Sequence, residues 1–199
     1  MVSDPDAALM VAFQGGDELA FRRLFEKYGR AMVAFCNHFV KDGARAEELA
    51  QDVFLKLHAN AARYRPTARF KTFLYRIASN HCLNELRRGE YAARRTESGQ
   101  RADAGDPVDP DSLAGSAATP EETVAAARLG RILESFLAKL PEKQRAAFVL
   151  GRLEGLSYEE IAVVLDTTLP AVKSLIHRAT VAAAAVLAPY APGAEEAAP

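Results

Sequence analysis

Cysteine and long hydrophobic runs are both scarce in this sequence. Cys36 and Cys82 are the 2 cysteines, too few for a disulfide framework, and their scarcity favours a reducing, cytoplasmic compartment. No apolar run approaches the roughly 18 residues that a membrane-spanning helix needs, so membrane insertion is not expected. The opening residues MVSDPDAALM include acids and lack a basic stretch before an apolar core, so no signal peptide is expected.

The motifs of common catalytic and metal sites are missing as well. The sequence contains no glycine-rich phosphate loop, no zinc-ligand spacing and no nucleophile elbow. The pairs Cys36-x-His38 and His81-Cys82 are isolated, and neither belongs to a set of four ligands. We therefore expect no metal, no cofactor and no enzymatic activity.

The formal net charge is only −1, but the charges are unevenly distributed along the chain. Residues 61–95 carry 9 basic and 2 acidic side chains, a net charge of +7, interspersed with aromatic residues. Residues 96–123 carry 1 basic and 7 acidic side chains, a net charge of −6. A basic block with aromatic residues is typical of a surface that binds a polyanion such as nucleic acid, although a solvated helix face would also fit.

The acidic block also indicates how the chain is divided. Residues 96–123 collect three prolines and three glycines and have only Val108 and Leu113 as sizeable apolar side chains, a composition typical of a flexible linker. We expect two small domains, residues 1–95 and 124–188, joined by this flexible acidic linker. Residues 189–199 are expected to form a disordered tail.

Both expected domains have helical patterns and no alternating strand pattern, so the predicted fold class is all-α. In the first domain, apolar residues recur at close to 3.6-residue spacing over residues 17–40. A second helix follows and contains Leu49 to Leu57, and a third spans about residues 71–88, with Phe73, Leu74, Ile77, Leu83 and Leu86 as expected core. In the second domain we expect helices over about residues 124–139, 141–153 and 157–165, and a last helix capped by Thr168.

The end of the second domain has the pattern of a helix-turn-helix. Ser157 and Glu160 form a capping box, Asp166 and Thr167 turn the chain, and Pro170 falls in the first turn of the next helix. An ordinary αα-hairpin is the alternative. In a helix-turn-helix the second helix enters the major groove, and the outward candidates for contacts with DNA are Thr168, Ala171, Lys173, Ser174, His177 and Arg178. Because residues 124–188 carry a net charge of only +2, we expect this module to bind DNA tightly only together with another component.

The basic block of the first domain has the composition expected for single-stranded nucleic acid. Tyr64 and Phe70 lie among arginines and the amides Asn80 and Asn84, and an unpaired base needs both a stacking surface and hydrogen bonds to its edge. Phe70, Phe73 and Tyr75 could instead be core residues. For Phe73 the core interpretation is favoured, whereas for Tyr64 and Phe70 both interpretations stay open.

Three stretches together resemble one family. The segment from Ala46 to Leu57, AEELAQDVFLKL, is similar to the core-polymerase-binding helix of bacterial RNA polymerase sigma factors, most of all the extracytoplasmic-function (ECF) class of the sigma-70 family. The segment from Phe70 to Arg88 resembles the −10 promoter segment of that class. LPEKQR, EGLSYEEIA and VKS, which begin at Leu140, Glu154 and Val172, resemble its −35-binding domain.

This resemblance implies a non-catalytic cytoplasmic transcription initiation factor. It implies contacts with the clamp and flap of core RNA polymerase, with duplex and melted promoter DNA, and with an anti-sigma factor. The implied polymerase-binding residues are Glu48, Leu49, Gln51, Asp52 and Leu55. The implied −10 residues are Tyr64, Arg65, Phe70, Lys71, Thr72, Arg76, Asn80, Asn84, Arg87 and Arg88, and the −35 residues are the six outward candidates named above.

Two alternative functions stay open at this point. A transcriptional regulator that binds duplex DNA without polymerase would explain the helix-turn-helix, but would leave the helix around residues 46–57 without a role. An adaptor that binds polymerase and no DNA would fit the near-neutral charge.

Overall fold

The computed structural model describes residues 4–96 and 120–188, with side chains described for residues 4–88 and 128–188. Within those ranges all regular structure is helical, as the sequence predicts. Residues 4–96 are called the first half below, and residues 120–188 the second half. The first half contains α1 (Pro5–Gln14), α2 (Glu18–Val40), α3 (Gly43–Ala59), the short 3₁₀ turn η1 (Ala61–Arg63) and α4 (Phe70–Thr96). The second half contains α5 (Pro120–Lys139), α6 (Glu142–Phe148), the π-type turn η3 (Val149–Leu153), α7 (Tyr158–Val164) and α8 (Leu169–Leu187).

Aspartate side chains begin each of the first three helices. Asp4, Asp17 and Asp42 accept hydrogen bonds from backbone N–H groups in the first turns of α1, α2 and α3. Asp4 also accepts a hydrogen bond of 2.6 Å from the backbone N–H of Phe70, so a single carboxylate joins the start of α1 to the start of α4. The helix α1 is not predicted from the sequence.

The spacing of apolar residues in α2 has the expected result. Leu24, Tyr28, Met32, Phe35 and Phe39 are all buried, which confirms the helical period. Leu19 and Phe25 belong to the same apolar pattern but lie 60% and 47% exposed. The apolar pattern of α2 therefore includes residues that do not belong to the core of the first half.

The helix α4 begins one residue before its predicted start and ends eight residues beyond its predicted end. Leu74 and Leu83 are buried as predicted, whereas Phe73, Ile77 and Leu86 are only partly buried against the core. The other buried residues of α4 are Phe70, Thr72, Tyr75, Ala78, Ser79 and Cys82.

The predicted linker, residues 96–123, and tail, residues 189–199, lie outside the described residues except at the linker's two ends. Thr96 ends α4, and residues 120–123 form the first turn of α5, which starts four residues earlier than predicted.

The helix-turn-helix is present as predicted. The Ser157 hydroxyl accepts from the Glu160 backbone N–H at 3.2 Å, and the Glu160 carboxylate accepts from the Ser157 N–H at 2.8 Å, which completes the capping box. Asp166 adopts a left-handed φ of 47° in the turn between α7 and α8. Gly155 has a φ of 68°, and this allows the chain to leave η3 and enter α7.

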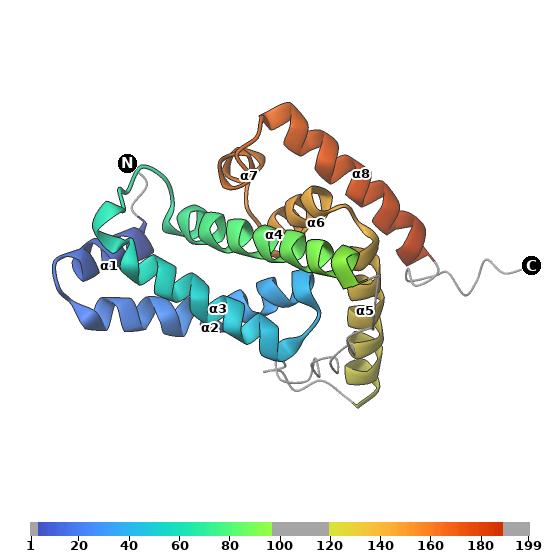
Figure 1. The fold of residues 1–199 in the computed structure, drawn as a ribbon, viewed down its shortest axis with the longest axis horizontal. Coiled ribbons are helices and arrows are strands. Elements are labelled where there is room, and N and C mark those ends of the chain that lie inside the picture. Colours follow the sequence, from blue (N-terminus) through green and yellow to red (C-terminus); the bar gives the residue numbers. More distant parts are fainter. Residues whose placement is uncertain (1–3, 97–119, 189–199) are drawn as a thin grey trace, which may run out of the picture.

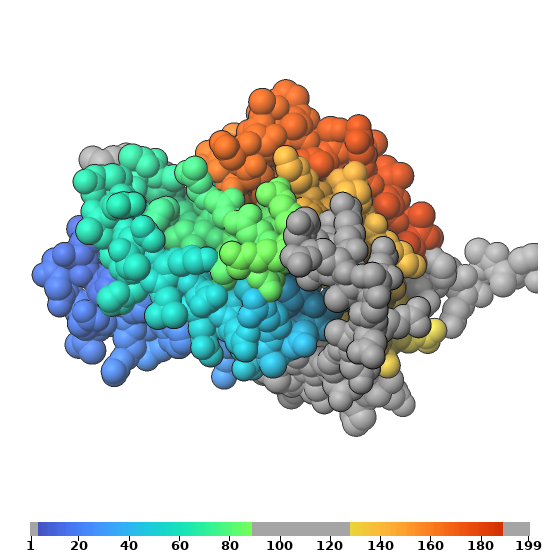
Figure 2. All heavy atoms as spheres, viewed as in Figure 1, coloured from blue at the N-terminus to red at the C-terminus, as the bar shows by residue number. Residues whose placement is uncertain are grey.

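The two halves pack against each other along α4. In Figure 1, α4 has α2 and α3 on one side and α6 and α7 on the other. The buried apolar side chains of the two halves belong to one cluster. Arg145 of α6 is buried and donates to the backbone carbonyl of Phe39 at the end of α2, at 3.3 Å. In Figure 2 the green surface of the first half lies directly against the orange surface of the second half.

Candidate nucleic-acid and partner surfaces

One face of α4 carries exposed basic and amide side chains. Arg76, Asn80, Asn84 and Arg88 are exposed and spaced four residues apart, so they lie along one stripe of the helix. The neighbouring Arg87 is also exposed, and its Nε lies 3.7 Å from a carboxylate oxygen of Glu142 in the second half. The stripe offers cationic groups and hydrogen-bonding amides on a rigid support, as nucleic-acid recognition requires.

The two predicted aromatic residues around the start of α4 are in the core. Tyr64 and Phe70 are 1% and 0% exposed, and the ring centroid of Tyr64 lies 5.0 Å from that of Phe73. Burial also raises the pKa of the Tyr64 phenol. This supports the core interpretation of both rings in this conformation, and their part in DNA binding stays a prediction. Arg65 is exposed, and its guanidinium donates to the backbone carbonyls of Ala62 and Tyr64.

Lys71 and Thr72, at the start of α4, contact the second half. The Lys71 ammonium donates to the backbone carbonyl of Glu154 at 2.5 Å, and the Thr72 hydroxyl donates to the Glu160 carboxylate at 3.1 Å. Both side chains are among the predicted −10 residues. In this conformation they are therefore already occupied by protein groups.

The outer face of α3 carries most of the predicted polymerase-binding residues. Glu48 and Gln51 are exposed, and Leu55 is 66% exposed, the most exposed large apolar side chain in the described part of the chain. Asp52 is partly exposed. Leu49 is 0% exposed and packs in the core, so its predicted contact with a partner is not available in this conformation and stays a prediction.

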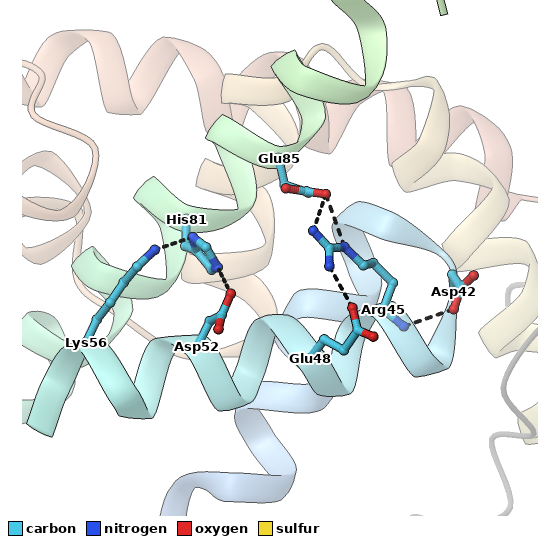
Figure 3. A network of polar contacts seen from close by, with 7 residues as sticks. All are labelled: Asp42, Arg45, Glu48, Asp52, Lys56, His81 and Glu85. Atoms are coloured by element: carbon cyan, nitrogen blue, oxygen red, sulfur yellow. Dashed lines mark hydrogen bonds and ion pairs between the residues drawn. The ribbon is translucent and has the colours of Figure 1, made fainter. Parts of the chain in front are cut away.

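Figure 3 shows polar side-chain contacts between α3 and α4 along this face. Arg45 donates to Glu85 of α4 at 2.5 Å and to Glu48 at 2.6 Å, and therefore bridges the two helices. Asp52, which follows Glu48 by four residues on α3, lies 3.1 Å from Nε2 of His81 on α4. The other ring nitrogen of His81, Nδ1, lies 2.5 Å from the ammonium of Lys56, which can only donate.

A groove of about 400 Å³ lies between α2 and α3 beside these residues. Gln51 lines it together with Phe25, Val33 and Phe54. Sequence reasoning placed Phe25 only in the apolar pattern of its helix. The helical period alone does not single out Phe25, because adjacent positions of α2 such as Phe35 and Cys36 are both buried.

The predicted −35 residues lie on the exposed side of α8 and at its start. Lys173, Ser174, His177 and Arg178 are all exposed and lie on one face, because they are spaced by one and four residues. Thr168 caps the helix through a hydrogen bond from the Ala171 N–H, at 3.4 Å, and Ala171 itself is partly buried. The opposite side of the helix is buried through Val172, Ile176 and Ala179.

The two cysteines lie next to each other in the core. Cys36 of α2 and Cys82 of α4 are both 0% exposed, and their sulfur atoms are 3.6 Å apart as free thiols. The hydrogen bond to Cys36, together with burial, raises the pKa of the Cys82 thiol. Within residues 4–88 and 128–188, no group of three or more His, Cys, Asp or Glu side chains could hold a metal ion. None of the described helices is long and apolar enough to cross a membrane.

Comparison with known proteins identifies the family. The family model of Sigma-70 region 2 matches residues 24–103 of this chain, and the family model of Sigma-70 region 4 matches residues 130–181. RNA polymerase sigma-H factor of Pseudomonas aeruginosa is 32% identical over 180 residues, which cover 90% of this chain and 92% of that protein. The chain belongs to the ECF class of the sigma-70 family. The ECF RNA polymerase sigma-E factor of Escherichia coli K12 is 31% identical to this sigma factor over 179 residues, 87% of this chain and 90% of the relative.

Solved structures share the fold of this sigma factor. The sigma factor RpoE of Bartonella quintana, solved in complex with the anti-sigma factor NepR, has a TM-score of 0.67 at 20% identity and covers 84% of this chain and 96% of its own. CnrH, solved in complex with the cytosolic domain of CnrY, has a TM-score of 0.66 at 24% identity, with 93% and 98% covered. The region 2 match spans α2, α3 and α4, and the region 4 match spans α6, α7 and most of α8.

Proposed function

We propose that this sigma factor directs core RNA polymerase to promoters by melting the −10 element with α4 and reading the −35 element with α8. It works in the cytoplasm as a binding protein, and the polymerase supplies catalysis. Residues 1–95 and 124–188 are its two functional domains, and residues 96–123 are the linker between them.

The exposed stripe of α4 is the observation that carries the proposal. Arg76 and Arg88 supply positive charge for the phosphates of a separated strand, while Asn80 and Asn84 can both donate to and accept from the edge of an unpaired base. Positive charge and amides on the same face suit single-stranded nucleic acid. The basic segment to which this face belongs, residues 61–95, carries a net charge of +7. Arg65, Lys71 and Thr72 extend the proposed interface toward the start of the helix.

The exposed face of α8 is proposed to read the −35 element in duplex form. Lys173 and Arg178 are suited to phosphates, and Ser174 and His177 to base edges in the major groove. Thr168 and Ala171 lie in the first turn, which approaches the groove most closely in helix-turn-helix proteins. The small number of contacts supports a module that works together with the polymerase rather than alone.

The α3 face and its groove are proposed to bind core polymerase. Leu55 supplies an exposed apolar side chain at its edge, and Gln51 connects it to the groove that Phe25 and Phe54 line. Apolar surface surrounded by Glu48 and Asp52 is the composition of a protein interface, in which acidic groups set the choice of partner. Membership of the family extends the proposal to control by an anti-sigma factor, the type of partner present in the Bartonella quintana complex.

Permanganate footprinting tests the strand-opening step. Core polymerase is incubated with the full chain on a promoter that supports transcription, and unpaired thymines are mapped. We expect reactive thymines in the −10 region with the wild-type chain, and their loss with Arg76→Ala/Asn80→Ala/Asn84→Ala, while polymerase binding is retained. Equal reactivity with both chains would contradict the proposal.

A further inference from the structure

Three glutamates of the second half contact side chains of α4 that we propose to bind DNA. Glu154 contacts Lys71, Glu160 contacts Thr72, and Glu142 lies 3.7 Å from Arg87. These contacts join residues that are between 55 and 88 positions apart in the sequence. Each contact places a glutamate carboxylate or backbone carbonyl against a side chain that, in the proposed function, contacts a phosphate or a base.

Glu154 has the most contacts of the three. Its carboxylate accepts a hydrogen bond from the Tyr75 phenol, which is 0% exposed, and its backbone carbonyl accepts from Lys71 at 2.5 Å. The Lys71 ammonium also lies 3.9 Å from the carboxylate and 5.5 Å from the centroid of the Tyr75 ring. The Glu154 side chain is only 14% exposed, so water screens these contacts far less than it screens surface ion pairs.

Glu160 uses its two carboxylate oxygens for different purposes. One oxygen accepts from the Ser157 N–H and completes the capping box, while the other accepts from Thr72 at 3.1 Å. The exposed guanidinium of Arg69 lies 3.9 Å from that second oxygen. The capping box therefore fixes the carboxylate in the orientation in which it meets α4.

We propose that Glu154 and Glu160 form a carboxylate latch that holds the second half on α4 and keeps Lys71 and Thr72 from DNA in the free sigma factor. The inference rests on the proposed function of α4. In the closed form, Lys71 meets the backbone carbonyl and the nearby carboxylate of Glu154, and Thr72 meets the carboxylate of Glu160, in place of phosphates and base edges of the promoter strand. Closure and binding of the melted strand are therefore mutually exclusive at the start of α4, and anything that opens the two halves raises the affinity for DNA.

The latch is tested by neutralising its two carboxylates in the full chain. Glu154→Gln/Glu160→Gln removes both charges, and glutamine at position 160 can still complete the capping box. Glu134→Gln/Glu159→Gln is the matched control, because it removes the same charge from the same half at residues for which the described part of the chain shows no hydrogen bond or ion pair. Compactness is measured as the radius of gyration by small-angle X-ray scattering, and binding by fluorescence anisotropy with a mixed-sequence single-stranded DNA of about 20 nucleotides, a length that covers more than one typical site.

We expect the latch variant to expand and to bind the oligonucleotide about tenfold more tightly than the control, since charge-assisted hydrogen bonds are lost from the closed state only. A latch variant as compact as the control would overturn the proposal. Expansion without DNA binding by any of the chains would support closure by the carboxylates and count against the proposed role of α4 instead.

A charge exchange keeps the test decisive if the latch variant folds poorly. Glu154→Lys places two ammonium groups together and should open the chain, and Lys71→Glu/Glu154→Lys should restore the compact form. Because Lys71 belongs to the proposed DNA interface, this pair is compared by scattering and by thermal unfolding alone. Failure of the exchange to restore compactness would contradict an electrostatic latch.

Discussion

The phenol of Tyr75 on α4 donates a hydrogen bond to the carboxylate of Glu154, 79 residues further along the chain. Burial, followed by this hydrogen bond, raises the pKa of Tyr75 far above its ordinary value. The phenol therefore stays protonated and remains a donor throughout the pH range in which the protein is folded. The helix that we propose to hold the melted strand is thus bonded to the half that we propose to read duplex DNA.

Tyr75→Phe should lower the free energy of unfolding by about 1–2 kcal/mol, because a buried hydrogen bond is lost with little change in shape. Urea titration followed by circular dichroism measures this loss. Tyr158→Phe is the control, since Tyr158 is 36% exposed and no hydrogen bond of its phenol is present in the described residues. Equal effects of the two substitutions would show that the Tyr75–Glu154 bond contributes nothing to stability.

His38 should make the fold sensitive to acid. Burial lowers the pKa of its imidazole from 6.5 to about 4, and Nδ1 has no hydrogen-bond partner among the described residues. The unfolded chain therefore takes up a proton below pH 6.5 that the folded chain takes up only near pH 4, so stability falls through this window as the pH falls. Relative to His38→Gln, the wild-type chain should lose about 2.5 kcal/mol between about pH 7.5 and about pH 4.5.

The measurement is a series of urea titrations at fixed pH values on both chains. His177→Gln serves as the control, because His177 is a histidine exposed on α8. Parallel pH profiles for the wild-type chain and His38→Gln would contradict the assignment of acid sensitivity to this residue.

Leu55→Ala should weaken binding to core polymerase about tenfold, as expected for an apolar contact residue within an interface. The free energy of unfolding should change by less than about 0.5 kcal/mol, because the side chain is largely exposed in the free protein. Leu19→Ala is the matched control: Leu19 is 60% exposed, against 66% for Leu55, and lies on α2. Anisotropy of the labelled full chain titrated with core polymerase separates the two, and similar losses for both would argue against the α3 face as the docking surface.

Lys173→Ala should reduce the salt dependence of promoter binding by about one unit of slope in a plot of log affinity against log salt concentration, because one phosphate contact is lost. The complex of polymerase with the full chain is titrated with potassium chloride on a duplex promoter fragment. Lys143→Ala is compared, since Lys143 is also exposed but lies on α6. An unchanged slope with Lys173→Ala would remove this residue from the −35 interface.

Local features of the fold could be predicted because short-range rules determine them. The period of Leu24, Tyr28 and Met32 places one face of α2 in the core, and side chains a few residues away cap α7 and α8. Exposure at Arg76 and Asn80 and burial at Leu74 follow from the same helical period.

Long-range features could not be predicted because no sequence period encodes them. The contact of Lys71 with Glu154 spans 83 residues and depends on how the two halves pack. The burial of Tyr64 and Phe70 depends on packing against one another and on Tyr28, whose phenol bonds to Asp6 of the unpredicted helix α1 at 2.6 Å. The local sequence around such a position is the same whether the aromatic side chain is exposed or buried.

Transcription in vitro tests the central claim most directly. The pure full chain is added to sigma-free bacterial core polymerase with a library of genomic promoters, and new transcript start sites are mapped. The account predicts discrete start sites with the wild-type chain, and their loss with Arg76→Ala/Asn80→Ala while polymerase binding is unchanged. No binding to core polymerase, or start sites that persist unchanged in the double variant, would contradict it.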